Sequence, residues 1–488
     1  MENNIFSTPA IPVENEAKEF EDVMDSISKW ISEYWQYPEQ YRVFPSVHPG
    51  DIKKQLPSTP PQSAEDISTI LEDFNRVIVP GITHWNHPGF MAYFGTTGSL
   101  PGVLAETLIA ALNVNSMLWR TSPSATELEE VALDWIRQML LLPKDFRGVI
   151  TDTASVSTLV ALAAARESLQ RNIRELGLAG RSDLSPLRLY CSDQAHSSVE
   201  KAGIVLGIGQ NNVVKISSND QFQMNADECA QAIQEDKQKG YLPFAVVGTA
   251  GTTATTSVDP ISALADICSR ENLWLHVDAA YGGAGALLPE KRELFKDIEQ
   301  ADSIVFNPHK WMFTQSDCSV LLVRHPDTLK QAFSLVPAYL RTDDGDATNF
   351  MDWGVQLGRR FRALKLWFII RRYGVEGIRK MIREHCRLAQ LFSSWVDSDE
   401  RFERIAPTLF SVVCFRFHPK NIQDEKVLER LNTELLQAIN ESGEFFLSTT
   451  VLNGKFILRV AIGNARTSEY HVRRLWESIQ KAVGNIKP

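Results

Sequence analysis

The chain contains few cysteines, and none of them is arranged for metal or redox chemistry. Only six of its 488 residues are cysteine, and no CxxC pair occurs. Widely spaced cysteines in apolar surroundings are typical of buried free thiols, so the sequence predicts neither a metal site nor a disulfide framework. The first residues, Met1-Glu2-Asn3-Asn4-Ile5-Phe6, also lack the basic region and apolar core of a signal peptide. We therefore expect a cytoplasmic protein.

Basic charge and long apolar runs are scarce as well. The sequence has 50 Lys and Arg residues against 60 Asp and Glu, which gives a formal net charge of −10. Without a basic excess there is no electrostatic footprint for a nucleic acid. No stretch approaches the roughly 20 apolar residues of a membrane span. Neither nucleic acid nor a membrane is therefore an expected partner, whereas a hydrophobic content of 44% is enough for a large core.

Two amphipathic helices are expected near the N-terminus. Large apolar residues recur at three- and four-residue steps between Phe20 and Tyr34, and again between Ile67 and Ile78. A proline-rich connector separates the two segments. Such a pair can hardly form a globule alone, so we expect residues 1–99 to be a helical dimerisation arm that packs on a second subunit. Packing on the same chain is the alternative.

Short apolar runs alternate with helical segments from about residue 148 onward. Runs without polar alternation are typical of strands buried on both faces, as in a mostly parallel sheet covered by helices. Ligands of such sheets bind at the carboxyl ends of the strands. We therefore expect a large ligand-binding domain over residues 100–365. The runs are 148–151, 187–191, 213–216, 244–248, 274–278, 303–307 and 320–323.

The pattern changes again after residue 365. A helical segment over 426–442 lies between strand-like runs at 411–417 and 455–461, and a last helix is expected near 469–483. This order of elements predicts a small C-terminal α+β domain over residues 366–488.

A lysine and an aspartate stand at the ends of two predicted strands. Lys310, in Pro308-His309-Lys310-Trp311, follows the run that ends at Asn307, and Asp278 ends the run that begins at Trp274. A lysine in this place can form a Schiff base with an aldehyde, and a carboxylate can hold a pyridine nitrogen protonated. A charge-assisted bond of that kind is worth about 1.5–3 kcal/mol. The pair predicts a pyridoxal phosphate site, although a surface lysine and a helix-capping aspartate are the alternatives.

These motifs, together with Asp193-Gln194-Ala195-His196-Ser197-Ser198, resemble the pyridoxal-phosphate group II decarboxylases, and among them the aromatic-L-amino-acid decarboxylases. The resemblance extends over residues 17–482. It implies a fold-type-I α/β enzyme with a mostly parallel sheet flanked by helices, a helical arm and a small α+β domain. It further implies decarboxylation of aromatic L-amino acids to amines and carbon dioxide by a homodimer with shared active sites.

The resemblance also implies roles for single residues. His196 would stack on the cofactor ring near the substrate carboxylate, and Tyr339, in a polar loop, would protonate the carbanion carbon. Thr153, Ala154 and Ser155 open an apolar helix whose N-terminus can bind a phosphate. The implied catalytic residues are Lys310, Tyr339, His196 and Asp278. The implied cofactor-binding residues are Thr153, Ala154, Ser155, His196, Thr253, Asp278, Ser303, Asn307, His309 and Lys310.

The substrate pocket and the phosphate-binding turn depart from the family pattern. Asn115 and Met117 stand where an isoleucine and a phenylalanine would contact the substrate ring, and Asp152 replaces an expected glycine. The departures at 115 and 117 weaken the assignment to one particular aromatic ring. The implied substrate-binding residues are Trp85, Phe94, Thr96, Asn115, Met117 and His196.

Three alternatives to an aromatic amino-acid decarboxylase follow. In an aldehyde synthase, oxygen intercepts the carbanion, but the presence of both His196 and Tyr339 argues against it. A decarboxylase of acidic or aliphatic amino acids is favoured only by Asn115 and Met117. A non-catalytic dimeric scaffold is disfavoured because Lys310, Asp278 and His196 are all present.

Overall fold

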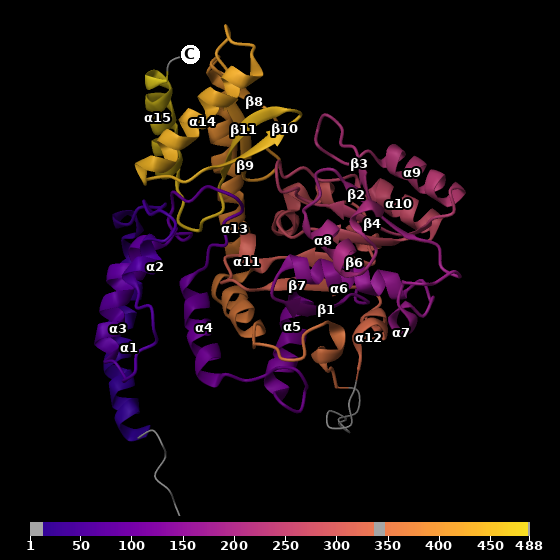
Figure 1. Ribbon diagram of the computed structural model, residues 1–488, viewed down its shortest axis with the longest axis horizontal. Helices are drawn as coiled ribbons and strands as arrows, with labels where there is room; N and C mark the ends of the chain where they lie inside the picture. The colour runs from indigo at the N-terminus through magenta and orange to yellow at the C-terminus, as the bar shows by residue number, and fades with distance from the viewer. Residues whose placement is uncertain (1–12, 336–346, 487–488) are drawn as a thin grey trace, which may run out of the picture.

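The N-terminal region forms the expected helical arm. The computed structural model describes residues 13–335 and 347–486. Trp30 stacks on Tyr34 at 5.2 Å and meets Phe74 edge-on at 5.3 Å, so the first long helix packs against the helical segment that begins at Ile67 (Figure 1). Phe20 and Ile70 stay exposed on the outside of this pair. The elements are α1 (Val13–Gln36), η1 (Pro38–Gln40), α2 (Asp51–Gln55), α3 (Ile67–Asp73), η2 (Phe74–Ile78) and η3 (Val79–Gly81).

A seven-stranded sheet forms the centre of the molecule, and it is mostly parallel, as expected. Its order is β1-β7-β6-β5-β4-β2-β3, and β7 runs antiparallel to both of its neighbours. All seven expected runs are strands. They are β1 (Arg147–Thr151), β2 (Leu187–Ser192), β3 (Val213–Ile216), β4 (Leu242–Thr249), β5 (Trp274–Asp278), β6 (Ser303–Phe306) and β7 (Ser319–Val323).

Helices cover both faces of this sheet. One of them, α6, begins at the carboxyl end of the sheet directly after β1, and its alanine-rich sequence lets it lie close against the strands. The helices are α4 (Leu100–Leu112), α5 (Pro123–Met139), α6 (Ala154–Glu167), α7 (Ile173–Leu176), α8 (Ser198–Val205), α9 (Ala226–Gln238), α10 (Ile261–Glu271), α11 (Pro308–Trp311) and α12 (Asp327–Phe333). Short segments of 3-10 helix are η4 (Gln210–Asn212), η5 (Gly282–Leu287), η6 (Pro289–Phe295), η7 (Ile298–Gln300) and η9 (Phe350–Trp353).

The C-terminal region forms a separate antiparallel sheet with its own apolar core, at the top of Figure 1. The sheet has the order β10-β11-β9-β8, and the predicted strands and helices are all present. The short β8 and the half-exposed β10 were not predicted. The elements are α13 (Ala363–Ser398), β8 (Phe402–Arg404), β9 (Val412–Phe417), α14 (Glu425–Ser442), β10 (Ser448–Leu452), β11 (Lys455–Ala461) and α15 (Glu469–Asn485).

The long helix α13 joins the two regions. It contacts α4 and α5 near its start and β8 and β9 near its end, with one break in helical geometry at Gly374, where φ is +64°. The predicted boundary at residue 366 therefore lies inside a helix rather than in a linker. The division into an arm, a large domain and a small domain stays a prediction.

Candidate active site

One cavity of about 200 Å³ lies at the carboxyl ends of the parallel strands. Nine of the ten predicted cofactor-binding residues line it, together with Phe94 from the predicted substrate pocket. The lining residues are Phe94, Thr153, Ala154, Ser155, His196, Thr249, Gly251, Thr253, Asp278, Ala280, Tyr281, Asn307, His309 and Lys310.

Lys310 and Asp278 reach this cavity from neighbouring strands. Lys310 lies on α11, directly after β6, and its Nζ is 5.3 Å from the centre of the Phe94 ring. Burial lowers the pKa of the Lys310 amine, and the charge of Asp278 opposes this shift. Asp278 is only 5% exposed, and its Oδ1 accepts the N–H of Ala280 at 3.0 Å. The pair therefore combines an amine that deprotonates readily with a fixed carboxylate.

His196 is held in one orientation by the residue that starts the following helix. The backbone N–H of Ser198 donates to His196 Nδ1 at 3.2 Å, and the Ser198 hydroxyl lies 2.8 Å from the same nitrogen. Because a backbone N–H can only donate, Nδ1 is the acceptor and the neutral ring carries its proton on Nε2. Burial lowers the pKa of His196, and the nearby charge of Lys310 lowers it further. The ring is therefore neutral near pH 7 with a free Nε2–H group.

The N-terminus of α6 offers donors for an anion. Thr153 is the N-cap residue, so the N–H groups of Ala154 and Ser155 lie in the first turn, where an α-helix supplies no backbone partner. A chain of buried hydroxyls lies beneath this turn and connects it to the end of β6. It runs from Thr151 Oγ1 to Ser157 Oγ (2.8 Å), to Ser319 Oγ (2.9 Å) and to Asn307 Oδ1 (2.6 Å).

Two further hydrogen-bond donors, on the side chains of His309 and Asn307, lie beside this turn. The N–H of Cys318 donates to His309 Nδ1 at 2.9 Å, and burial lowers the pKa of His309 to about 4, so the ring carries its proton on Nε2 at neutral pH. The Nε2 atom lies 3.3 Å from Asn307 Nδ2, whose amide oxygen already accepts the Ser319 hydroxyl. Two neighbouring donors of this kind are best satisfied by one anionic oxygen that accepts a hydrogen bond from each. Together with the first turn of α6, they fit a phosphate group.

Ser303 does not belong to this group, which corrects its predicted place in the phosphate site. It is the first residue of β6, in register with His276, and its Oγ contacts Trp274 Nε1 and His276 Nδ1, each at 2.8 Å. Asn307 follows four residues later, and a strand advances about 3.3 Å per residue. Ser303 therefore lies at the opposite end of the strand, and Ser319 occupies the place beside Asn307 that was predicted for it.

Several lining residues were not predicted from the sequence. Thr249 is in register with Asp278 at the end of β4, a neighbour that the strand order would have indicated. Gly251 has a φ of +102°, and a Cβ atom on it would lie 2.9 Å from the backbone nitrogen of Gly282, so the close approach of two loops requires glycine. Tyr281 stacks on Phe94 with ring centres 3.8 Å apart. It gave no signal in the sequence.

Apart from Phe94 and His196, the predicted substrate-binding residues do not line the cavity within this chain. Trp85 stacks on Phe90 at 4.3 Å, and Thr96 is half-buried outside the lining set. Asn115 Oδ1 accepts the backbone N–H of Arg359 at 2.9 Å, and Met117 packs against a small apolar cluster. Tyr339 lies outside the described residues. Contacts of these residues with substrate stay predictions.

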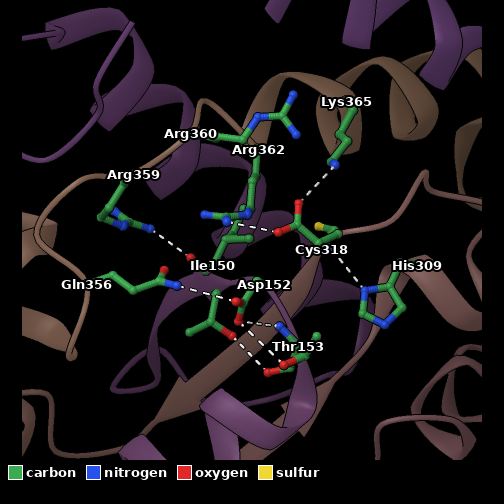
Figure 2. Close-up of polar contacts among 12 residues, drawn as sticks. Ile150, Asp152, Thr153, His309, Cys318, Gln356, Arg359, Arg360, Arg362 and Lys365 are labelled. Carbon is green, nitrogen blue, oxygen red and sulfur yellow. Dashed lines mark hydrogen bonds and ion pairs between the residues drawn. The ribbon is translucent and has the colours of Figure 1, made fainter. Parts of the chain in front are cut away.

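A group of basic residues surrounds the turn before α6 on its other side (Figure 2). Arg359 Nη2 donates to the Ile150 carbonyl at 2.8 Å and pairs with Glu129 at 2.6 Å, while Arg362 Nη2 donates to Asp317 at 2.9 Å. These bonds attach the segment before α13 to β1 and to the loop that follows Lys310. Asp152, whose charge needed a partner, lies among them and accepts a hydrogen bond from Gln356 at 3.3 Å.

All six cysteines are buried free thiols, as the sequence predicted. Within residues 13–335 and 347–486, no cluster of three or more His, Cys, Asp or Glu side chains could hold a metal ion. In the same ranges, no helix is both long and apolar enough to cross a membrane.

Lys310 and Asp278 lie at the carboxyl edge of a mostly parallel sheet, beside a group of donors that fits a phosphate. This arrangement is that of a pyridoxal-phosphate enzyme of fold type I. Residues 49–418 match the pyridoxal-dependent decarboxylase conserved domain, and the chain belongs to this family. It is therefore a carboxy-lyase that uses pyridoxal phosphate, as its site predicts.

Similar proteins include both decarboxylases and aldehyde synthases. The chain is 40% identical to the aromatic-L-amino-acid decarboxylase of Bos taurus over 483 residues, which cover 96% of this chain and 97% of that protein. It is also 40% identical to the phenylacetaldehyde synthase of Arabidopsis thaliana over 468 residues, 94% of each chain. The crystal structure of Oryza sativa TDC with PLP and tryptamine superposes with a TM-score of 0.92 at 35% identity, covering 98% of this chain and 99% of that one.

Proposed function

We propose that this enzyme decarboxylates aromatic L-amino acids to the corresponding amines and that it works as a homodimer with shared active sites. The observation that carries the proposal is the meeting of Lys310, Asp278 and His196 at one cavity walled by the Phe94 ring. Relatives that resemble the chain over nearly its whole length are named for aromatic amino acids or for aldehydes derived from them.

In this proposal, Asp278 and Lys310 hold the cofactor in place and control its protonation. Bound pyridoxal phosphate accepts the electron pair that is released when the bond from Cα to the carboxylate breaks. Asp278, fixed by the N–H of Ala280, would keep the pyridine nitrogen of the cofactor protonated. Lys310 would hold the cofactor through Nζ, and the lowered pKa of its amine favours the neutral form that such a bond requires.

His196 and Tyr339 act on the substrate side in this proposal. His196, with Nδ1 occupied by Ser198, presents Nε2–H to the cavity and orients the substrate carboxylate. Tyr339 delivers a proton to Cα after carbon dioxide has left. The assignment of Tyr339 rests on the sequence.

A second subunit is proposed because α4 leaves an apolar face uncovered. Its four leucines at four-residue steps are Leu100, Leu104, Leu108 and Leu112, with exposed fractions of 47%, 63%, 46% and 57%. A continuous exposed apolar stripe of this kind marks a protein interface. Asn115 and Met117 follow this stripe within five residues of Leu112, which places them near the proposed interface.

Aldehyde formation is the second candidate, because an aldehyde synthase is as similar to this chain as the bovine decarboxylase is, at 40% identity each. In that reaction oxygen reacts at Cα before a proton arrives. The outcome depends on the proton donor, and the presence of Tyr339 and His196 favours the amine.

The test is incubation of the purified enzyme with phenylalanine, tyrosine, dihydroxyphenylalanine, tryptophan and 5-hydroxytryptophan, with glutamate as a non-aromatic comparison. Amine, aldehyde, carbon dioxide and peroxide are measured under air and under nitrogen. We expect amine from at least one aromatic substrate in both atmospheres. Turnover of glutamate alone would overturn the aromatic assignment, and aldehyde as the main product under air would favour the second candidate.

A further inference from the structure

Asp152 places a negative charge directly before the N-terminus of α6, where a phosphate is expected to bind. It lies in the turn between β1 and α6, and its Oδ1 accepts the backbone N–H of Thr153 at 2.7 Å and lies 3.4 Å from the Thr153 hydroxyl. This N–H is therefore directed to the protein's own carboxylate. The donors left for a ligand at this turn begin at Ala154, one residue further along the helix.

The surroundings of Asp152 balance its charge only in part. Gln356 donates to Asp152 Oδ2 at 3.3 Å but carries no charge. Arg362 lies above Asp152 in Figure 2, and its Nη2 is already bonded to Asp317 at 2.9 Å. Burial acts to lower the pKa of Arg362, whereas the carboxylates of Asp317 and Asp152 raise it above its ordinary value overall. One guanidinium thus faces two carboxylates.

Two of the donor atoms of Arg362 are not used in hydrogen bonds among the described residues. Its side chain is 8% exposed, and within the described part of the chain its Nε and Nη1 atoms have no hydrogen-bond partner. A buried guanidinium with two unpaired donors stabilises any negative charge brought near it. Because Arg362 is shared between Asp317 and Asp152, part of the Asp152 charge stays uncompensated beside the N-terminus of α6.

We propose that Asp152 is a positioning residue that weakens the binding of the cofactor through its phosphate. The carboxylate accepts the Thr153 N–H group and repels the phosphate dianion that binds at the next residues, and Arg362 offsets only part of this charge. A neutral residue at this position would remove the repulsion and leave the N-terminus of α6 to act on the phosphate. The cofactor of this enzyme is accordingly held less tightly than the same donors would permit.

The decisive variant is Asp152→Asn, because the asparagine oxygen can still accept the Thr153 N–H while the charge is removed. Apoenzyme is titrated with pyridoxal phosphate and, separately, with pyridoxal, which lacks the phosphate, and the dissociation constants are obtained by equilibrium dialysis. We expect Asp152→Asn to bind pyridoxal phosphate about tenfold more tightly than the parent. Its affinity for pyridoxal should not change.

Two further variants distinguish the effect of the Asp152 charge from that of its hydrogen bond with Gln356. Asp220→Asn removes one negative charge from an exposed loop and should leave both dissociation constants at the parent values. Gln356→Met removes the hydrogen bond to Asp152 but keeps the carboxylate, so the affinity for pyridoxal phosphate should change less than about twofold.

The proposal is overturned if Asp152→Asn binds pyridoxal phosphate no more tightly than the parent, or if pyridoxal affinity rises equally. It is also overturned if Gln356→Met reproduces the gain, because the tether rather than the charge would then set the affinity. Since only the cofactor is titrated, these outcomes do not depend on which amino acid the enzyme accepts.

Discussion

Arg459 donates hydrogen bonds to the carbonyl oxygens of Thr253 and Ala254, each at 2.7 Å, across more than 200 residues of sequence. Arg459 lies on β11 of the C-terminal sheet and is 4% exposed, whereas Thr253 lines the cavity. The small sheet therefore fixes one wall of the active site directly.

Replacing Arg459 by methionine should destabilise the protein. The change removes the arginine donors of two carbonyl oxygens and leaves that of Ala254 only the weak Cys414 Sγ donor at 3.3 Å, so we expect the free energy of unfolding to fall by about 2–4 kcal/mol. Urea unfolding measures this loss. Arg430→Met, which removes an exposed arginine paired with Glu434 at 2.8 Å, serves as the control and should change the free energy by less than about 0.5 kcal/mol. Equal effects of the two variants would contradict the structural role of Arg459.

Lys310→Ala should abolish turnover and leave the fold intact, because the donors that fit the phosphate and Asp278 remain. Amine formation should be undetectable, while the apoenzyme still binds the cofactor non-covalently in equilibrium dialysis. Lys330→Ala, at an exposed lysine on α12, provides a comparison with normal turnover. Steady amine production by Lys310→Ala would refute the assignment of this lysine.

Tyr339→Phe should change the product rather than stop the reaction. The variant loses one hydroxyl and keeps the aromatic ring, so carbon dioxide is still released but the carbanion carbon meets oxygen before a proton. We expect a shift from amine to aldehyde, ammonia and peroxide under air, and little aldehyde under nitrogen. Tyr470→Phe, at a residue 66% exposed on α15, should give amine only. Unchanged amine output from Tyr339→Phe would require another proton donor.

Met117→Phe should narrow the range of substrates. In addition to Phe94, it would supply an aromatic ring, which binds an aromatic substrate more tightly than the methionine thioether does. The ranking of kcat/KM values across the five aromatic amino acids checks this. Val131→Phe adds a ring at an exposed position of α5 and should leave the ranking unchanged. An unchanged ranking in Met117→Phe as well would place Met117 outside the substrate pocket.

Stability should fall in mild acid because of buried histidines. His385 accepts the Trp311 indole N–H at 2.9 Å, and burial lowers the pKa of His385 to about 4. An unfolded histidine binds a proton below about pH 6.5, whereas the folded one stays neutral to about pH 4, so the unfolding free energy decreases as pH falls through this window. His385 alone accounts for at most roughly 3 kcal/mol.

Urea unfolding between pH 7 and pH 5 tests this dependence. His385→Gln should be less stable at pH 7 but lose less stability on acidification than the parent. His48→Gln, at a side chain 88% exposed, should follow the parent at every pH. A parent whose stability rises as pH falls from 6.5 would contradict the argument.

The local patterns of the sequence were sufficient for the strands and for most of the cavity. Uninterrupted apolar runs gave all seven strands, and residues just past their ends, such as Asp278 and Lys310, met at one cavity because parallel strands share a carboxyl edge. Ser303 was misplaced because its role was taken from the family resemblance, although it is the first residue of the run 303–307 and Asn307 is the last. The hydrogen bonds of Ser303 with Trp274 and His276 occupy the far end.

Contacts between distant segments could not be predicted in this way. In the sequence, nothing distinguishes Arg459 from other charged residues in strands. Its contact with Thr253 depends on how the two sheets are oriented. The partners of Asp152 depend likewise on the course of the chain after residue 347, which no periodicity describes. Local patterns fix elements and strand ends, whereas packing between domains brings in residues without a local signal.

The part of α13 that follows the break at Gly374 restricts how relatives of this protein can differ in length. His385 contacts Trp311 beside the active lysine, and Ser393, two turns later, bonds Thr408 in the C-terminal region at 2.8 Å. A single inserted residue between them would rotate the following turns by about 100° and move them by about 1.5 Å. Insertions and deletions can therefore accumulate in the loops of this enzyme, but the stretch of α13 between these two contacts must keep its length.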